Sequence, residues 1–213
     1  MFPPASDLIA LLGIALALSA GCLRLLSWRH GVTPWSKWGA AAVFVLLWCP
    51  MGPAPLPLVA YVRGISSDLS ISLVAIACLG MYQRLRGVSL VAQRERMAVN
   101  LAFAVGALFL YPLALGWGDW DAYRLGWGSP GLWAVLLALS LACWVKGFRL
   151  LPVLVALALL AWVAGAFEST NLWDYLMDPW LAVAAIFQCT GSAVGWVLAR
   201  LRGTRMGLTV SSS

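Results

Sequence analysis

The stretch LLPVLVALALLAWVAGAFESTNLWDYLMDPWLAVAAIFQCTGSAVGWVLA, residues 150–199, places an acidic loop between two apolar segments. Residues 150–166 and 181–199 contain no charged side chain, whereas the loop between them carries Glu168, Asp174 and Asp178 and no base. A run of about 20 apolar residues is long enough to cross the hydrocarbon core of a bilayer as a helix. The stretch therefore predicts two membrane-spanning helices joined by a short acidic loop.

The composition of the whole chain agrees with this prediction. The chain is 62% hydrophobic and only 10% charged, whereas a soluble domain averages about 25% charged residues. So few charges cannot coat a water-soluble globule of 213 residues. The net charge of +6 does not indicate nucleic acid as a partner, because the bases flank apolar segments instead of forming one stripe. We therefore predict an all-α integral membrane protein embedded in a lipid bilayer.

Apolar segments suggest how many times the chain crosses the membrane. Seven candidates are present: 8–23, 38–52, 58–82, 97–117, 130–145, 150–167 and 179–199. The second and fifth are short for a span of about 20 residues, but their terminal tryptophans can lie at the membrane interfaces. We predict a single bundle of about seven transmembrane helices over residues 1–203. A short disordered cytoplasmic tail is expected at 204–213.

The loop charges predict the orientation of this bundle. With the N-terminus outside, 12 of the 14 Lys and Arg residues fall in cytoplasmic segments, and Arg63 and Arg124 are the exceptions. Seven of the eight acids fall outside, and Glu95 is the exception. Basic residues are enriched in the cytoplasmic loops of membrane proteins. The N-terminus is therefore expected outside and the C-terminus in the cytoplasm, in a bacterial inner membrane.

The first candidate site lies in the third apolar segment. Prolines up to Pro57 prevent a helix from starting earlier, so a helix that starts there would place Arg63 near the outer hydrocarbon boundary. Asp68 would then lie about 7 Å deeper, with Ser67 beside it. A carboxylate at that depth often marks a functional path. The alternative is that Ser67 or Asp68 caps a helix that begins only there, at the interface.

The second candidate site is the loop LGWGDWDAYRLGWGSPG, residues 115–131. Tryptophans surround Asp119 and Asp121, and glycines allow the backbone to turn tightly. Such a loop could bind a sugar, a cation or a lipid head group. The alternative is an interfacial loop with aromatic anchors, in which Arg124 pairs with Asp121.

The acidic loop 167–180 is the third candidate site. A short amphipathic helix is expected there, with Leu172, Trp173, Leu176 and Met177 on its apolar face. Asp174 and Asp178 are four residues apart and share the opposite face. Asp178 precedes Pro179, which predicts that it caps the last span. Glu168, Asn171 and Asp174 then remain as candidates for an outward-facing acidic site shared with Asp68, Asp119 and Asp121.

Polar residues in the middle of the last apolar segment predict contacts with other helices. Gln188, Thr190 and Ser192 can hydrogen-bond across helices, and Gly191 and Gly195 form a GxxxG face.

Several classes of membrane protein are excluded by missing residues. A single histidine, His30, excludes haem held by two histidines of one chain. Lys37 and Lys146 lie at the ends of apolar segments, which excludes a retinal Schiff base in mid-helix. The five cysteines form no CxxC pair, and no Walker motif is present. We expect no metal and no cofactor.

Three functions are compatible with the sequence. The first is a non-catalytic subunit or scaffold that binds other membrane proteins, since no soluble domain is expected. The second is a transporter or a lipid or glycan translocation component, with a path at Arg63 and Asp68. The third is a membrane-embedded transferase that uses outer-face carboxylates on a lipid-linked substrate. Enzymatic activity is left open, and a lipid head group or glycan is an expected ligand at the outer face.

Overall fold

The computed structural model describes the backbone of residues 4–52 and 56–210, with side chains as far as Arg200. The described chain is all-α, as predicted, apart from one short antiparallel pairing of β1 (Pro50–Met51) with β2 (Leu56–Pro57). The helical elements follow one another as α1 (Ala5–Leu26), α2 (Pro34–Leu47), α3 (Leu58–Ser66), α4 (Ile71–Arg86), α5 (Gln93–Ala114), the 3₁₀ helix η1 (Ala122–Gly126), α6 (Pro130–Val145), α7 (Leu150–Val163), α8 (Leu172–Leu176) and α9 (Pro179–Val210).

Three of these helices are long and apolar enough to cross a membrane: α1, α5 and the part of α9 from Pro179 to Arg200. This fits a membrane protein. Helices α2, α6 and α7 have 14, 16 and 14 residues, which correspond to about 21–24 Å at 1.5 Å per residue. The hydrocarbon core is about 30 Å thick. The arrangement with seven spans therefore stays a prediction.

The third predicted helix, 58–82, is interrupted in the structure. Helix α3 ends at Ser66 and α4 begins at Ile71, so the expectation of one continuous helix is wrong. The alternative, in which Ser67 or Asp68 caps a helix that begins there, is also not met: α4 begins a few residues later, and its cap is Ser70, whose hydroxyl accepts the N–H of Leu73 at 3.2 Å. The Asp68 carboxylate binds Arg63 instead.

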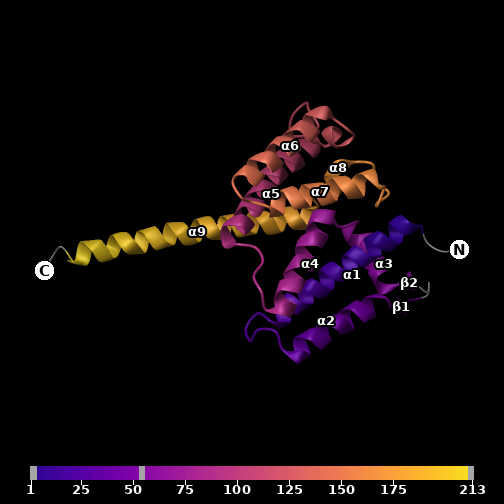
Figure 1. The fold of residues 1–213 in the computed structure, drawn as a ribbon, viewed down its shortest axis with the longest axis horizontal. Coiled ribbons are helices and arrows are strands. Elements are labelled where there is room, and N and C mark those ends of the chain that lie inside the picture. The colour runs from indigo at the N-terminus through magenta and orange to yellow at the C-terminus, as the bar shows by residue number, and fades with distance from the viewer. Residues whose placement is uncertain (1–3, 53–55, 211–213) are drawn as a thin grey trace.

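The helices form two groups, each with its own core. Figure 1 shows α1 to α4 on one side and α5 to α8 on the other, with α9 running along the second group. The first core joins Leu11 and Ile14 of α1 to Leu47 of α2 and Val59 of α3. The second core is larger and gathers side chains from α5 to α9. Leu73 of α4 packs against both cores and so connects the groups.

Helix α9 leaves the body of the molecule along its length. Leu181 and Ala185 near its start are buried in the second core, whereas every residue from 191 to 200 is exposed. Figure 1 shows the helix extending well beyond the other elements. Its backbone is helical as far as Val210, where the composition predicts a disordered tail, and residues 211–213 lie outside the described residues.

Candidate functional site

Most of the predicted site residues gather at one end of the bundle, which we call the acidic end. The α3–α4 junction, η1 and α8 with the loop before it form this end. Two cavities open here and share Ser67 and Asp68 as lining residues. A third cavity lies toward the opposite end of α4, where Arg24, Arg84 and Arg96 line it.

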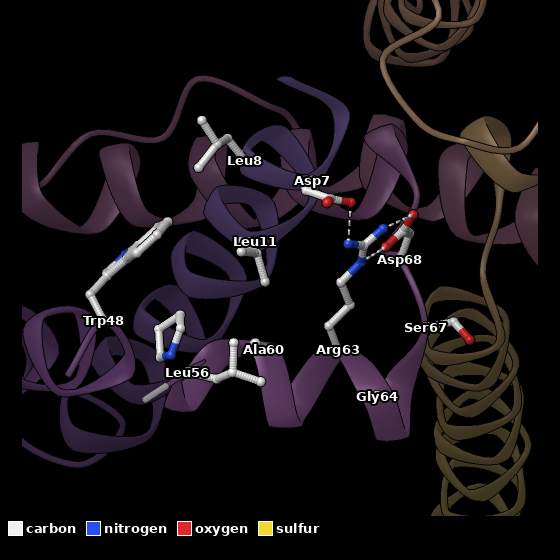
Figure 2. A pocket seen from close by; sticks show the side chains of 11 residues that line it. Asp7, Leu8, Leu11, Trp48, Leu56, Ala60, Arg63, Gly64, Ser67 and Asp68 are labelled. Atoms are coloured by element: carbon white, nitrogen blue, oxygen red, sulfur yellow. Dashed lines mark hydrogen bonds and ion pairs between the residues drawn. The ribbon is translucent and has the colours of Figure 1, made fainter. Parts of the chain in front are cut away.

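Cavity 1 is an apolar groove that ends at charged residues. It has a volume of about 790 Å³ and lies between α1, α3 and the end of α2. Its apolar walls are formed by Leu8 and Leu11 of α1, by Trp48 and by Ala60. Figure 2 shows Arg63 to one side of these apolar side chains.

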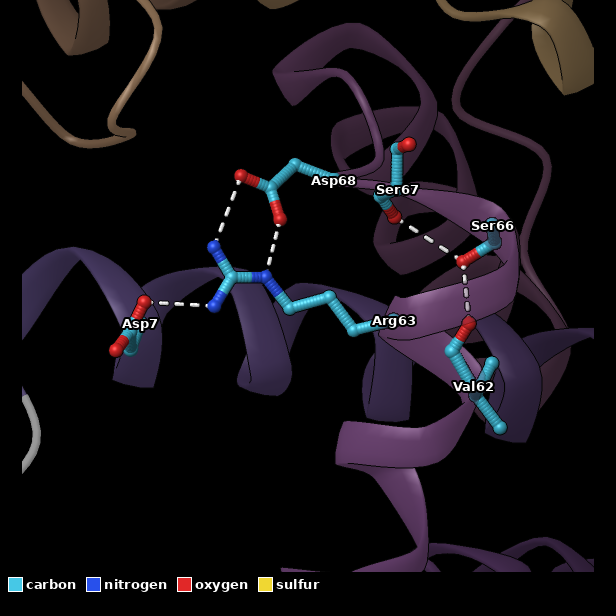
Figure 3. A network of polar contacts seen from close by, with 6 residues as sticks. All are labelled: Asp7, Val62, Arg63, Ser66, Ser67 and Asp68. Atoms are coloured by element: carbon cyan, nitrogen blue, oxygen red, sulfur yellow. Dashed lines mark hydrogen bonds and ion pairs between the residues drawn. The ribbon is translucent and has the colours of Figure 1, made fainter.

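Arg63 links two carboxylates from different elements (Figure 3). Its Nε donates to Asp68 Oδ1 at 2.5 Å, its Nη2 to Asp68 Oδ2 at 3.3 Å, and its Nη1 to Asp7 Oδ1 at 2.6 Å. The three side chains are only 22–25% exposed, so the pairing offsets part of the cost of removing the charges from water. The triad ties α3 to the first turn of α1. The sequence placed Arg63 and Asp68 in one candidate site without predicting that they pair, and it gave no reason to add Asp7.

Ser67 stands at the α3–α4 junction in a strained conformation. Its φ of 59° and ψ of −171° fall in a region that is populated almost only by glycine. Among the described non-glycine residues it alone has a positive φ. In Figure 2 the Ser67 side chain points away from the Arg63 guanidinium. The strain lets the chain leave α3 and still direct Asp68 toward Arg63.

Cavity 2 brings three of the predicted carboxylates together. It has a volume of about 470 Å³, and Asp68, Glu168 and Asp174 line it together with the capping residue Asp178. No Lys, Arg or His is among its lining residues. Its aromatic lining residues are Tyr111, Tyr123, Phe167 and Trp173. The described residues therefore form an acidic cavity with aromatic walls, which contains three of the predicted carboxylates but neither Asp119 nor Asp121.

Asp174 is held by two hydroxyl groups. The Tyr123 hydroxyl lies 2.9 and 2.8 Å from its two oxygens and donates to the carboxylate, and Ser169 Oγ also donates to it. Burial, followed by the hydrogen bond to Asp174 and its negative charge, raises the pKa of Tyr123 above the usual range. Tyr123 and Ser169 were missed in the sequence, because nothing in it indicates that residue 123 meets residue 174.

Asp178 joins the starts of two helices. Its Oδ1 accepts the N–H of Leu181 at 2.9 Å, which confirms the predicted cap of α9. Its Oδ2 accepts the N–H of Ser70 at 2.8 Å, at the start of α4. The side chain is only 4% exposed, and a carboxylate near two helix N-termini is stabilised by both helix dipoles. This second contact was not predicted.

Asn171 and Asp121 have structural roles in the loops of the acidic end. Asn171, only 1% exposed, accepts the N–H of Trp173 and donates to the carbonyl of Tyr123, both at about 3 Å. A Cβ at Gly126 would lie 1.7 Å from Asn171 Oδ1, so the η1 and α8 segments can approach this closely only with glycine at 126. Asp121 caps η1 through the N–H of Tyr123.

Asp119, Arg124 and Glu168 are all exposed. Glu168 lines cavity 2, whereas Asp119 and Arg124 are not among the lining residues of the three cavities. The ion pairs found within the described residues are those of Arg63, so Arg124 does not pair with Asp121. A shared site with Asp119 and Asp121 is thus not assembled, because Asp121 turns back to cap its own segment.

The polar residues of α9 give a mixed result. Asn100 of α5 donates to Gln188 at 3.0 Å, which confirms an interhelical hydrogen bond. Thr190 instead bonds to carbonyls of its own helix. Nothing lies within 4 Å of a Cβ built on Gly191 or Gly195, so no described residue packs closely against the GxxxG face.

The chemistry of the site follows from these contacts. The carboxylates of Asp68, Asp174 and Asp178 already accept hydrogen bonds from groups of the protein. Over the described ranges, 4–52 and 56–200, no three His, Cys, Asp or Glu side chains come close enough to hold a metal ion. The geometry therefore supports a role of these carboxylates in holding helices together more directly than a role in binding a ligand.

Comparison of the chain with protein-family models, curated proteins and solved structures found no match. The site is therefore interpreted from its own geometry.

Proposed function

We propose that this chain is a multi-pass membrane protein that acts as a non-catalytic subunit or scaffold of a membrane complex. One observation carries the proposal: six of the eight acidic side chains accept hydrogen bonds from the protein, and all but Asp121 thereby join different segments of the fold. They are Asp7, Asp68, Glu95, Asp121, Asp174 and Asp178. A general base or nucleophile needs a lone pair directed at a substrate, whereas each of these carboxylates directs at least one lone pair at a group of the fold.

The exposed apolar surface supports a membrane environment and a helical partner. Leu108, Val135, Leu160 and Phe187 are each more than 60% exposed, as expected for side chains that face lipid. The open Gly191–Gly195 face on α9 suits close packing by a helix of another membrane protein. Within the proposal the N-terminus is outside, the C-terminus is cytoplasmic and the membrane is a bacterial inner membrane.

Reporter fusions test the topology. A periplasmic reporter fused after Asp174 is expected to be active, and the same reporter fused after Arg149 silent. The opposite pattern contradicts the orientation.

Cross-linking along α9 tests the scaffold role. A photo-reactive residue placed at 198, beside the glycine face, is expected to give a protein adduct in cells, and Gly191→Leu with Gly195→Leu should abolish it. Ala193→Leu with Val197→Leu is the matched control, because these positions have the same spacing on the opposite face. Wild-type protein that gives lipid adducts alone, or a control pair that loses the adduct equally, contradicts the proposal.

A second candidate function is lipid or glycan translocation. The specific observation in its favour is that cavities 2 and 3 lie on either side of the contact between Asp178 and Ser70. Cavity 2 reaches Asp178 and Pro179, while cavity 3 reaches Leu181 and Leu73, one helical turn further along each helix. Opening this contact would join the two cavities.

Reconstitution tests this second candidate. The purified chain in liposomes should accelerate the transfer of fluorescent phospholipid between leaflets, measured by dithionite quenching. Asp68→Asn should abolish the transfer, whereas exposed Asp119→Asn should not. Rates equal to those of empty liposomes would remove translocation of these lipids from consideration.

A further inference from the structure

Three arginines from different elements surround the mouth of cavity 3. Arg24 comes from the last turn of α1, Arg84 from the last turn of α4, and Arg96 from the first turn of α5. All three are exposed. They are close enough that the charges of Arg24 and Arg96 both act unfavourably on that of Arg84. The fold therefore concentrates positive charge at one opening.

This positive charge has no acidic partner in the described part of the chain. No carboxylate of a described residue lies within 4.0 Å of the three guanidinium groups. Glu95 is adjacent to Arg96 in sequence, but its carboxylate accepts the N–H groups of Arg149 and Leu150 at the start of α7. Arg96 donates instead to the neutral Gln83, at 2.8 Å. Like charges held together without a counter-ion form a site for an anion.

Behind the arginines the cavity is mainly apolar. It has a volume of about 460 Å³ and extends between α4, α5 and α9. Leu73, Ile76 and Ala77 of α4 line one wall, and Leu181 and Ala185 of α9 line another. From Arg84 to Leu73 the depth along α4 is about 16 Å at 1.5 Å per residue. This is enough for much of an acyl chain.

We propose that cavity 3 binds an anionic phospholipid, whose phosphate contacts Arg24, Arg84 and Arg96 and whose acyl chain lies between α4 and α9. Guanidinium groups match phosphate oxygens in charge and geometry, and basic pockets between helices at the cytoplasmic side of membrane proteins bind acidic head groups. Free phosphate would use the arginines alone, whereas the lipid also uses the apolar walls. The proposal does not depend on the role of the protein as a scaffold.

Lipid titration of the full chain tests the proposal. The protein is purified in mild detergent, stripped of lipid and titrated with phosphatidylglycerol or phosphatidylcholine of identical chains, with binding read by native mass spectrometry. Phosphatidylglycerol should bind at least tenfold more tightly. Each single Arg→Gln change at 24, 84 or 96 should weaken this binding by about fivefold, and the triple change should remove the preference.

The matched control removes the same charge elsewhere on the same side. Arg29→Gln, Lys37→Gln and Lys146→Gln change three exposed residues that are not among the lining residues of cavity 3, and the preference should survive. Ala77→Trp, which keeps all the arginines and fills the cavity, should weaken phosphatidylglycerol binding at least fivefold. If the triple arginine variant is poorly folded, the single variants and Ala77→Trp decide.

Three results would overturn the proposal. The first is equal affinity for phosphatidylglycerol and phosphatidylcholine. The second is a control triple variant that loses the preference as fully as the triple arginine variant does. The third is complete displacement of the lipid by millimolar inorganic phosphate, together with unchanged lipid binding in Ala77→Trp. The last result would assign the arginines to a free anion.

Discussion

The charged groups of cavities 2 and 3 lie toward opposite ends of α4 and differ in what they bind. The charged groups that line cavity 2 are all carboxylates, and three of the four accept hydrogen bonds from the protein. Those of cavity 3 are all arginines, and they have no acidic partner among the described residues. Charges that neighbouring groups satisfy hold helices together, whereas charges left without a counter-ion are available to a ligand.

Removing the Asp178 carboxylate should cost the most stability, because two helix starts depend on it. Asp178→Ala leaves the N–H groups of Ser70 and Leu181 without a partner in a buried place. We expect a loss of about 3 kcal/mol in the free energy of unfolding, measured by denaturant titration in detergent micelles. Asp119→Ala, at an exposed residue, should change stability by less than about 0.5 kcal/mol. Equal effects would mean that cavity 2 is not held together by its acids.

Arg63 provides the second test of the comparison. Arg63→Met leaves Asp7 and Asp68 with unpaired negative charge beside each other. We expect a loss of about 2 kcal/mol, reduced from the value for a fully buried pair because the triad is partly exposed. Arg124→Met, at the other base predicted outside, should be close to neutral in the same unfolding experiment. A neutral Arg63→Met would show that the triad does not join α1 to α3.

Removing the Tyr123 hydroxyl should reduce the free energy of unfolding by a smaller amount, and this amount should depend on pH. Burial and the hydrogen bond to Asp174 raise its pKa above the ordinary value, so the neutral phenol is favoured in the folded protein. Its contribution, about 1 kcal/mol, should be fully present below about pH 10. It should be lost as the pH rises through the raised pKa.

The difference in unfolding free energy between wild type and Tyr123→Phe measures this contribution. It should be constant from pH 7 to 9 and shrink at higher pH. A difference that grows with pH would contradict the assigned direction of the pKa shift.

Ser67 should show the smallest effect, with the opposite sign. Ser67→Gly removes the strain of a positive φ and should stabilise the protein by up to about 1 kcal/mol. Ser66→Gly is the control, because Ser66 is helical and glycine there should destabilise by about 1 kcal/mol. The unfolding temperatures of Ser67→Gly and Ser66→Gly, measured together with that of the wild type, test this prediction. A destabilising Ser67→Gly would mean that the Ser67 side chain is needed at the junction.

Much of the fold was readable from local sequence. Each predicted apolar segment contains a helix, because hydrophobic runs and prolines act over a few residues. The break at 67–70 was less accessible. The prolines were compatible both with one continuous helix over 58–82 and with a helix that begins near Ser67. The break is accompanied by the ion pair of Asp68 with Arg63 and by the hydrogen bond from the N–H of Ser70 to Asp178, and neither contact can be read from local sequence.

The candidate site was predicted in part. Asp68, Glu168 and Asp174 do line one cavity, because the segments before α4 and α8 that carry them lie at the same end of the described bundle. Arg124 in η1 and Asp119 in the turn before it do not join the cavity and are exposed, because their direction depends on local backbone geometry that charge counting ignores. The partners Tyr123 and Ser169 carry no charge and so gave no signal.

The sequence by itself determined an all-α chain with long apolar helices and with acids and bases segregated between its loops, because hydropathy and charge are properties of short segments. Tertiary structure alone decided which polar groups meet. Asp7 and Arg63 are 56 residues apart, Tyr123 and Asp174 are 51 apart, and Ser70 and Asp178 are 108 apart. Such contacts depend on how helices pack against one another, and so does the gathering of three arginines without a counter-ion at the mouth of cavity 3.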